Sequence, residues 1–160
     1  MPQQTLDLST PALRCALRLA GGLALDAFGL PGAPWALPSS PLFAVEVDGR
    51  RIDGRSPGLA LVDSALQEQP GGRRELLIRL RDDAAGLAID YQLALYEGTA
   101  LLESWVTLRN IGAGTRRVAR IDSLALDLPP GAYELHSFTG DWGLEFEPHR
   151  APLAAATTLE

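Results

Sequence analysis

The chain has 160 residues, 46% of them hydrophobic, and a formal net charge of -6. This length suits one domain with its own core, and the negative charge would repel a phosphate backbone, so nucleic acid is not an expected partner. No apolar run reaches the roughly 20 residues that a membrane span needs, so no membrane contact is expected. Cys15 is the only cysteine. With no disulfide possible within the chain, a cytoplasmic location is expected.

The first third of the chain is predicted to form strands. Residues 13–19 and 23–28 form two of them across a glycine pair, because each glycine would cost about 1 kcal/mol in a helix relative to alanine. Residues 29–41 contain four prolines and Trp35 and are expected to form a stiff, extended loop that suits a wall or a partner contact. Residues 43–48 are predicted to turn at Asp48-Gly49 and to return as the second strand of a hairpin.

Five further strands are predicted, at residues 76–81, 87–95, 102–109, 118–128 and 133–139. The clearest is 87–95, where apolar and polar or small residues alternate with a period of two, which is typical of a strand with one buried face. A short link containing glycine joins it to 102–109, so these two strands are predicted to form an antiparallel hairpin.

Side-chain alternation also predicts which faces are buried. In residues 102–109 the inner face is expected to carry Leu102, Val106 and Leu108. In residues 118–128 one face is expected to carry Val118, Leu124, Leu126 and Leu128, with Ile121 on the other.

Turn-forming clusters of glycine, proline and aspartate recur about every ten residues, which is typical of sandwiches and barrels. The predicted fold is therefore all-β, with antiparallel strands. Residues 1–158 are assigned to one domain. Residues 159–160 follow an alanine-rich run and resemble the remnant of a cloning site, so they are left out of the fold.

The sequence offers few groups for catalysis. A glycosidase needs two carboxylates facing each other across a sugar, and Glu145 with Glu147 is the one pair near aromatic residues. Residues two apart in a strand point the same way, so this pair could line one surface. The alternative is that both are solvated carboxylates on an exposed strand.

Other kinds of site are less well supported. His136 and His149 are the only histidines, and no metal-ligand spacing surrounds them, so no metal is expected. A triad of Ser137, His149 and Asp141 lacks the nucleophile motif that such sites use. The glycine turn at 112–114 has no helix start or lysine for phosphate. No catalytic residue and no cofactor is assigned.

Residues 133–150 differ in composition from the rest of the chain. They gather aromatic side chains, both histidines, several carboxylates and an arginine, whereas aromatic residues make up 6% of the whole chain. Aromatic faces stack on sugars while charged groups bind hydroxyls, so the segment suits a carbohydrate-facing edge. Alternatively, Tyr133, Phe138 and Phe146 form a core and the polar residues are solvated. Trp142 lies among glycines and is expected to be at least partly exposed.

Three stretches in the second half of the chain carry a resemblance to a known family. Residues 102–112 end in a hydrophobic-x-Asn-x-Gly turn, residues 121–129 hold a serine followed by alternating leucines, and residues 138–145 contain Gly-x-Trp-x-x-Glu. In this order they resemble the N-terminal domain of melibiase-type α-galactosidases, glycoside hydrolase family 36. The resemblance covers roughly residues 75–153.

This resemblance implies an antiparallel β-supersandwich of the galactose mutarotase-like type. In the family this domain packs on a catalytic (β/α)8 barrel, takes part in oligomer contacts and leaves the catalytic aspartates to the barrel. The family's supersandwich continues past the point where this chain ends, so a truncated domain is expected.

The expected function is that of a non-catalytic N-terminal accessory domain of an α-galactosidase that hydrolyses terminal α-galactosides. It would contribute to the active-site rim or to an oligomer interface, with the barrel of the same parent chain, an α-galactoside and further copies as partners. The alternatives are a free-standing carbohydrate-binding or mutarotase-like sandwich and a structural interaction module. The candidate rim or interface residues are Trp142, Glu145, Asp141, His149, Arg150 and Trp35.

Overall fold

The computed structural model describes residues 4–19 and 22–153, and every regular element in these ranges is a β-strand. All strand pairs are antiparallel, so the predicted all-β, antiparallel fold is confirmed. Two compact units make up the chain, residues 1–128 with β1 to β11 and residues 129–160 with β12 and β13. The described part contains no helix capable of crossing a membrane. The supposed cloning remnant at 159–160 lies outside the described residues.

The first sheet of residues 1–128 has the strand order β1-β2-β3-β4. Its strands are β1 Gln4–Ser9, β2 Arg14–Leu19, β3 Leu23–Leu30 and β4 Ala33–Ser40. The two strands predicted on either side of the glycine pair are confirmed as β2 and β3, which are neighbours. Strand β1 was not predicted, because its six residues follow a polar start and give no strong turn signal.

The prediction of a loop at residues 29–41 is wrong. Most of this stretch is β4, which pairs with β3 from Leu30↔Ala33 to Leu25↔Ser40. Proline cannot donate a ladder hydrogen bond and is tolerated on an edge strand or at a bulge. Strand β4 is the edge of its sheet, and its register shifts between the pairs at Leu25 and Ala27. The prolines of this stretch are therefore compatible with its being an irregular edge strand.

The second sheet has the order β10-β9-β8-β7. Its strands are β7 Ala60–Gln69, β8 Arg73–Asp82, β9 Leu87–Tyr96 and β10 Leu102–Asn110. The alternation predicted in β9 is confirmed, since its odd-numbered side chains from 87 to 95 are buried. The predicted hairpin of β9 and β10 and the inward side chains of β10 are also confirmed. Strand β7 was missed because it is an edge strand with mostly exposed side chains and no alternating pattern.

The third sheet has the order β11-β5-β6, with β5 Leu42–Val47, β6 Arg50–Asp53 and β11 Val118–Ala125. The predicted hairpin of β5 and β6 is confirmed. The predicted faces of β11 are confirmed in part. Leu126 and Leu128 pack against the core and Leu124 lines an apolar cavity together with Leu126, whereas Val118 and Ile121 are nearly half exposed. The strand ends at Ala125, and two register shifts against β5 interrupt its period of two.

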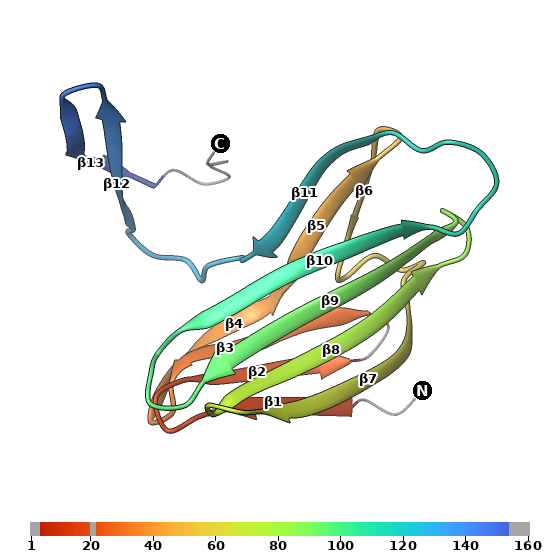
Figure 1. The fold of residues 1–160 in the computed structure, drawn as a ribbon, viewed down its shortest axis with the longest axis horizontal. Helices are drawn as coiled ribbons and strands as arrows, with labels where there is room; N and C mark the ends of the chain where they lie inside the picture. The colour runs from red at the N-terminus through yellow and green to blue at the C-terminus, as the bar shows by residue number, and fades with distance from the viewer. Residues whose placement is uncertain (1–3, 20–21, 154–160) are drawn as a thin grey trace. The chain divides into compact units, whose positions relative to one another are not determined.

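The core of residues 1–128 lies between the first and second sheets, which face each other as two layers in Figure 1. Strand β5 of the third sheet also contributes to this core. Phe43 from β5 stacks on Tyr91 from β9, with ring centroids 5.5 Å apart and an interplanar angle of 29°. Both side chains are fully buried.

Three backbone segments meet closely at Gly54, just after β6. Its carbonyl accepts a 2.6 Å hydrogen bond from the Leu23 N–H. A Cβ atom added to Gly54 would lie 2.1 Å from the Leu23 carbonyl oxygen and 2.2 Å from the Pro41 carbonyl oxygen. The same addition at Gly22 would come within 2.2 Å of the Gly54 oxygen. Positions 22 and 54 therefore require glycine, because any side chain there would separate β3, the β4–β5 corner and the end of β6.

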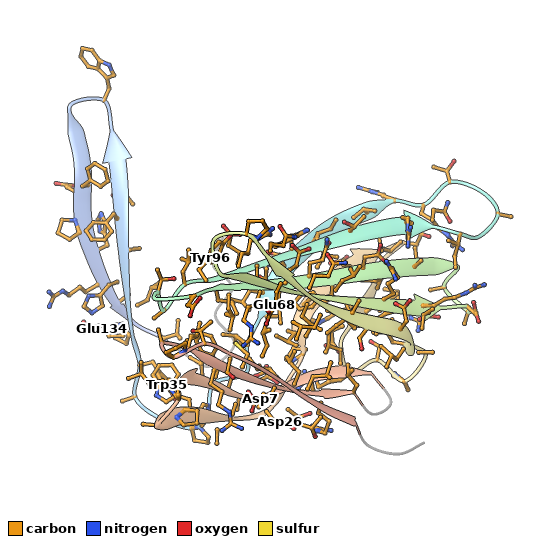
Figure 2. The ribbon with its side chains drawn as sticks, turned by 60° about the horizontal axis from the view of Figure 1, so that its bottom comes forward. Asp7, Asp26, Trp35, Glu68, Tyr96 and Glu134 are labelled. Carbon is orange, nitrogen blue, oxygen red and sulfur yellow. The ribbon has the colours of Figure 1, made fainter. Side chains whose placement is uncertain are left out.

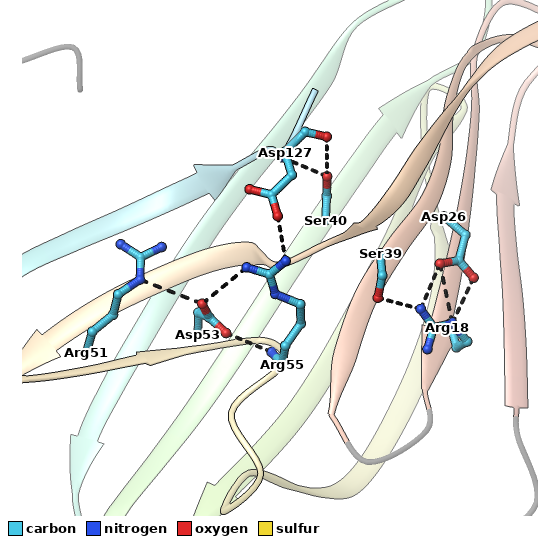
Figure 3. Close-up of polar contacts among 8 residues, drawn as sticks. All are labelled: Arg18, Asp26, Ser39, Ser40, Arg51, Asp53, Arg55 and Asp127. Carbon is cyan, nitrogen blue, oxygen red and sulfur yellow. Dashed lines mark hydrogen bonds and ion pairs between the residues drawn. The ribbon is translucent and has the colours of Figure 1, made fainter. Parts of the chain in front are cut away.

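Polar contacts fix the segment that follows β11 (Figure 3). The buried Ser40 hydroxyl donates to the Asp127 carbonyl at 3.0 Å and accepts from the Asp127 N–H at 2.8 Å. The Asp127 carboxylate pairs with Arg55 at 2.5 Å, and Arg55 also pairs with Asp53 at 3.7 Å. These contacts hold residue 127, next to the end of the first unit, against the β4–β5 corner and the residues after β6.

Candidate functional site

The segment with the unusual composition forms a hairpin of β12 Glu134–Asp141 and β13 Leu144–Pro152. Only Trp142 and Gly143 link the two strands, and Gly143 has φ +85°. Glycine adopts this left-handed conformation without the steric cost of a Cβ atom, which explains its place in a tight turn. The base is tied by the Leu153 N–H, which donates to the Tyr133 carbonyl at 2.9 Å. Figure 2 labels Glu134 at the start of this hairpin.

A β-bulge interrupts β13 close to the turn. The register passes from Thr139↔Glu147 to Asp141↔Leu144, so β13 has one more residue than β12 in this interval. Phe146 lies in the interval and has φ +62°, a left-handed conformation that is uncommon for a residue with a side chain. Glu145 and Glu147 would share a face in a regular strand. The bulge lies between them, so the prediction that they line one surface loses its premise.

The cross-strand pairs place the two basic candidates on opposite faces of the hairpin. Arg150 pairs with His136, whereas His149 pairs with Ser137, and consecutive residues of a strand point to opposite faces. The His149 Nε2 atom makes a 2.6 Å hydrogen bond with the Thr139 hydroxyl. On the other face the His136 Nε2 atom lies 2.5 Å from a Glu134 carboxylate oxygen. The strand geometry therefore does not bring His149 and Arg150 together.

Aromatic side chains of the hairpin are exposed. Trp142 at the turn is 99% exposed, as expected, and Phe146 and Phe138 are 76% and 66% exposed. The alternative that Phe138 and Phe146 form a core is therefore wrong. Tyr133, by contrast, is half-buried, and its hydroxyl donates to the Pro129 carbonyl at 2.7 Å.

The remaining candidates divide between the two compact units. Asp141 and Glu145 are strand residues of the hairpin, but their side chains lie outside the described part of the structure. Trp35 belongs to the other unit. It lies on β4, opposite Phe28 of β3, and is 60% exposed. Figure 2 labels Trp35 on the first sheet. A role of these residues in a rim or an interface stays a prediction.

The described residues offer little catalytic chemistry. No group of three or more potential metal ligands occurs within ranges 4–19 and 22–153. Cys15 is buried, and burial, followed by the nearby Asp7, raises the pKa of its thiol to about 12. Burial likewise raises the pKa of Tyr91 above its usual range. A neutral thiol in the core is a poor nucleophile, so neither group is suited to catalysis.

Comparison with solved structures finds the crystal structure of the α-galactosidase from Lactobacillus brevis. The TM-score is 0.70 at 18% sequence identity, and the match covers 95% of this chain and 28% of the other. At this identity the likeness shows a shared fold. The present chain spans 28% of the length of that α-galactosidase. The comparison with curated proteins found no match.

A family model gives the assignment that the fold alone does not. The model of the glycosyl hydrolase family 36 N-terminal domain matches residues 39–159. This range includes all three stretches that carry the resemblance in the sequence, and it covers most of the chain. The chain therefore belongs to the family of glycosyl hydrolase family 36 N-terminal domains.

Proposed function

We propose that this chain is the non-catalytic accessory domain of an α-galactosidase that hydrolyses terminal α-galactosides. In this proposal it packs on the catalytic barrel of the same parent enzyme, and the hairpin of β12 and β13 contributes to the active-site rim or to an oligomer interface. The family assignment and the fold shared with the Lactobacillus brevis α-galactosidase support the enzyme class. The small share of that enzyme covered by this fold leaves room for a separate catalytic part.

The exposed aromatic side chains of the hairpin carry the proposal. A two-stranded hairpin is marginally stable by itself in water, yet this one exposes Trp142, Phe146 and Phe138. Large aromatic residues are enriched at the energetic centres of protein interfaces, where burial in a partner stabilises the complex. Their exposure here suits a docking element better than a part of a self-sufficient core.

The test substitutes Trp142 in two settings. In the 160-residue chain, Trp142→Ala should change the free energy of unfolding by less than about 0.5 kcal/mol, because the side chain is 99% exposed. In the full-length enzyme, the same change should cost about 2 kcal/mol or more in docking or in transition-state binding. Leu30→Ala is a matched control, since it also truncates an exposed apolar side chain but lies in the other compact unit.

The readouts distinguish the two roles. A rim role predicts a lower kcat/KM on a chromogenic α-galactoside with an unchanged sedimentation coefficient, and an interface role predicts dissociation of subunits. If Trp142→Ala leaves both the activity and the assembly of the full-length enzyme unchanged, the docking role of the hairpin is wrong. Hydrolysis of the chromogenic substrate by the isolated 160-residue chain would contradict the non-catalytic role.

A further inference from the structure

An apolar cavity with a volume of about 40 Å³ lies within the first compact unit. Its walls come from β2 and β3 of the first sheet, β9 and β10 of the second sheet, β5, and residues 124–126. The lining residues are Cys15, Leu25, Phe28, Leu42, Leu93, Leu102, Leu124 and Leu126. The cavity therefore occupies part of the space between the two sheets that face each other in Figure 1.

The walls of this cavity offer no partner to a polar ligand. Seven of the eight lining residues are leucine or phenylalanine, and no oxygen or nitrogen atom of the described residues is exposed on the walls. The eighth is Cys15, where burial, followed by the nearby Asp7, raises the pKa of the thiol to about 12 and so keeps it uncharged at neutral pH. A buried water molecule needs about two to four polar partners. The cavity is therefore dry.

One wall of the cavity lies close to the surface. Cys15, Leu25, Leu42 and Leu93 are at most 2% exposed, whereas Leu124 lines the same cavity and is 45% exposed. The other three lining residues are only partly buried. The Leu124 side chain thus contacts both the cavity and the solvent, and exposed side chains change rotamer within nanoseconds. This gives a small ligand a way in without movement of a strand.

From these observations we propose that the cavity binds a small apolar ligand, with the size of a xenon atom or of about one to three carbon atoms. The atoms that line a void lack dispersion contacts on one side, and an apolar ligand restores these contacts. Water cannot compete, because it would lose its hydrogen bonds on entering. A sugar is excluded for the same reason, since nothing on the walls would satisfy its hydroxyl groups.

The volume of the cavity sets the size of the ligand. A dry apolar cavity of about 150 Å³ holds benzene or xenon, so the cavity of about 40 Å³ in this domain suits the smaller of these two. The affinity is expected to be weak, because so small a ligand makes few contacts. The binding involves neither the hairpin nor a catalytic partner, so it goes beyond the proposed function and does not depend on it.

The experiment follows the leucine methyl resonances of the isotope-labelled 160-residue chain as the pressure of xenon is raised. The methyl groups of the lining leucines should show saturable shifts. Leu80 and Leu87 belong to the same core but do not line the cavity, so their methyl groups should shift little. The same pressure of helium, which is far less polarisable than xenon, controls for pressure and should give no saturable shifts.

Two variants of β10 test the size of the cavity with benzene as the probe. Leu102→Ala removes a lining side chain, so it should bind benzene about tenfold more tightly than the parent chain, with shifts at the remaining lining leucines. Leu108→Ala is the matched control, because Leu108 is also partly buried against the core but does not line the cavity. Equal benzene shifts at the lining leucines of both variants would overturn the inference. So would xenon shifts in the parent chain that do not saturate or that are equal for lining leucines and for Leu80 and Leu87.

Discussion

Replacement of Gly54 by alanine should be among the most destabilising single-methyl additions in this domain. The new Cβ atom would meet the Leu23 and Pro41 carbonyl oxygens at 2.1 and 2.2 Å. Both are backbone atoms, so neither can move away by a change of rotamer. Gly54 is not among the glycines with positive φ, so its backbone conformation is open to alanine and the cost is steric.

The expected magnitude follows from two contributions. Overpacking typically costs about 1 to 3 kcal/mol, and occasionally more. Separating Leu23 from Gly54 would also weaken their 2.6 Å hydrogen bond, which is worth about 0.5 to 1.5 kcal/mol. We therefore expect Gly54→Ala to lower the free energy of unfolding by about 3 kcal/mol. Urea unfolding followed by far-UV circular dichroism measures this as a lower midpoint with an unchanged slope.

The matched control is Gly32→Ala. An added Cβ atom at Gly32 meets nothing within 4 Å, and this glycine also has no positive φ. Its substitution should change the free energy of unfolding by no more than about 0.5 kcal/mol. If Gly54→Ala costs as little as Gly32→Ala, the close approach of β3, β6 and the β4–β5 corner does not exist as described.

Three further predictions concern buried polar groups. Ser40→Ala should cost about 1 to 3 kcal/mol in urea unfolding, because it removes both hydrogen bonds to Asp127; no loss would mean that water replaces them. Tyr91→Phe should lower the free energy of unfolding by no more than about 1 kcal/mol in the same assay, because the buried hydroxyl lies near the Ser104 side chain but makes no hydrogen bond of regular geometry in the described part, and a larger loss would reveal a full hydrogen bond to Ser104. Cys15, with its pKa raised from 9.0 to about 12, should react with iodoacetamide at pH 8 only when the chain unfolds, and rapid modification of the folded chain would contradict its burial. Because the unfolded thiol loses its proton near pH 9 and the folded one does not, its contribution to stability is complete below pH 9 and decreases as the pH rises toward 12.

The sequence predicts best where one face of a strand is buried along its full length. In β9 the period of two appears both in the sequence and in the burial. The prediction fails where the backbone departs from a regular ladder. Register shifts in β4 and β11 change the direction of side chains, and edge strands such as β7 need no alternation because little of them is buried. The neighbouring strands determine where a bulge or a sheet edge occurs, so the local sequence pattern does not reveal either of them.

The candidate site was partly predictable for the same reason. The composition of residues 133–150 set this segment apart, and the exposure of Trp142 followed from its neighbours. Only the first strand of the hairpin, at residues 133–139, was predicted, and β13 was not. The bulge at Phe146 was not predictable, because nothing in its residue type favours a positive φ.

The strand orders also bear on how the domain folds. The first two sheets are meanders in which each strand pairs with its neighbour in the sequence, whereas β11 pairs with β5 across the whole second sheet. Local contacts form faster than those that close a long loop. We therefore expect the two meanders to form early and the docking of β11 on β5 to come last. Until that step β5 has an unpaired edge made of core residues, so a nascent chain is most prone to aggregation before β11 is available.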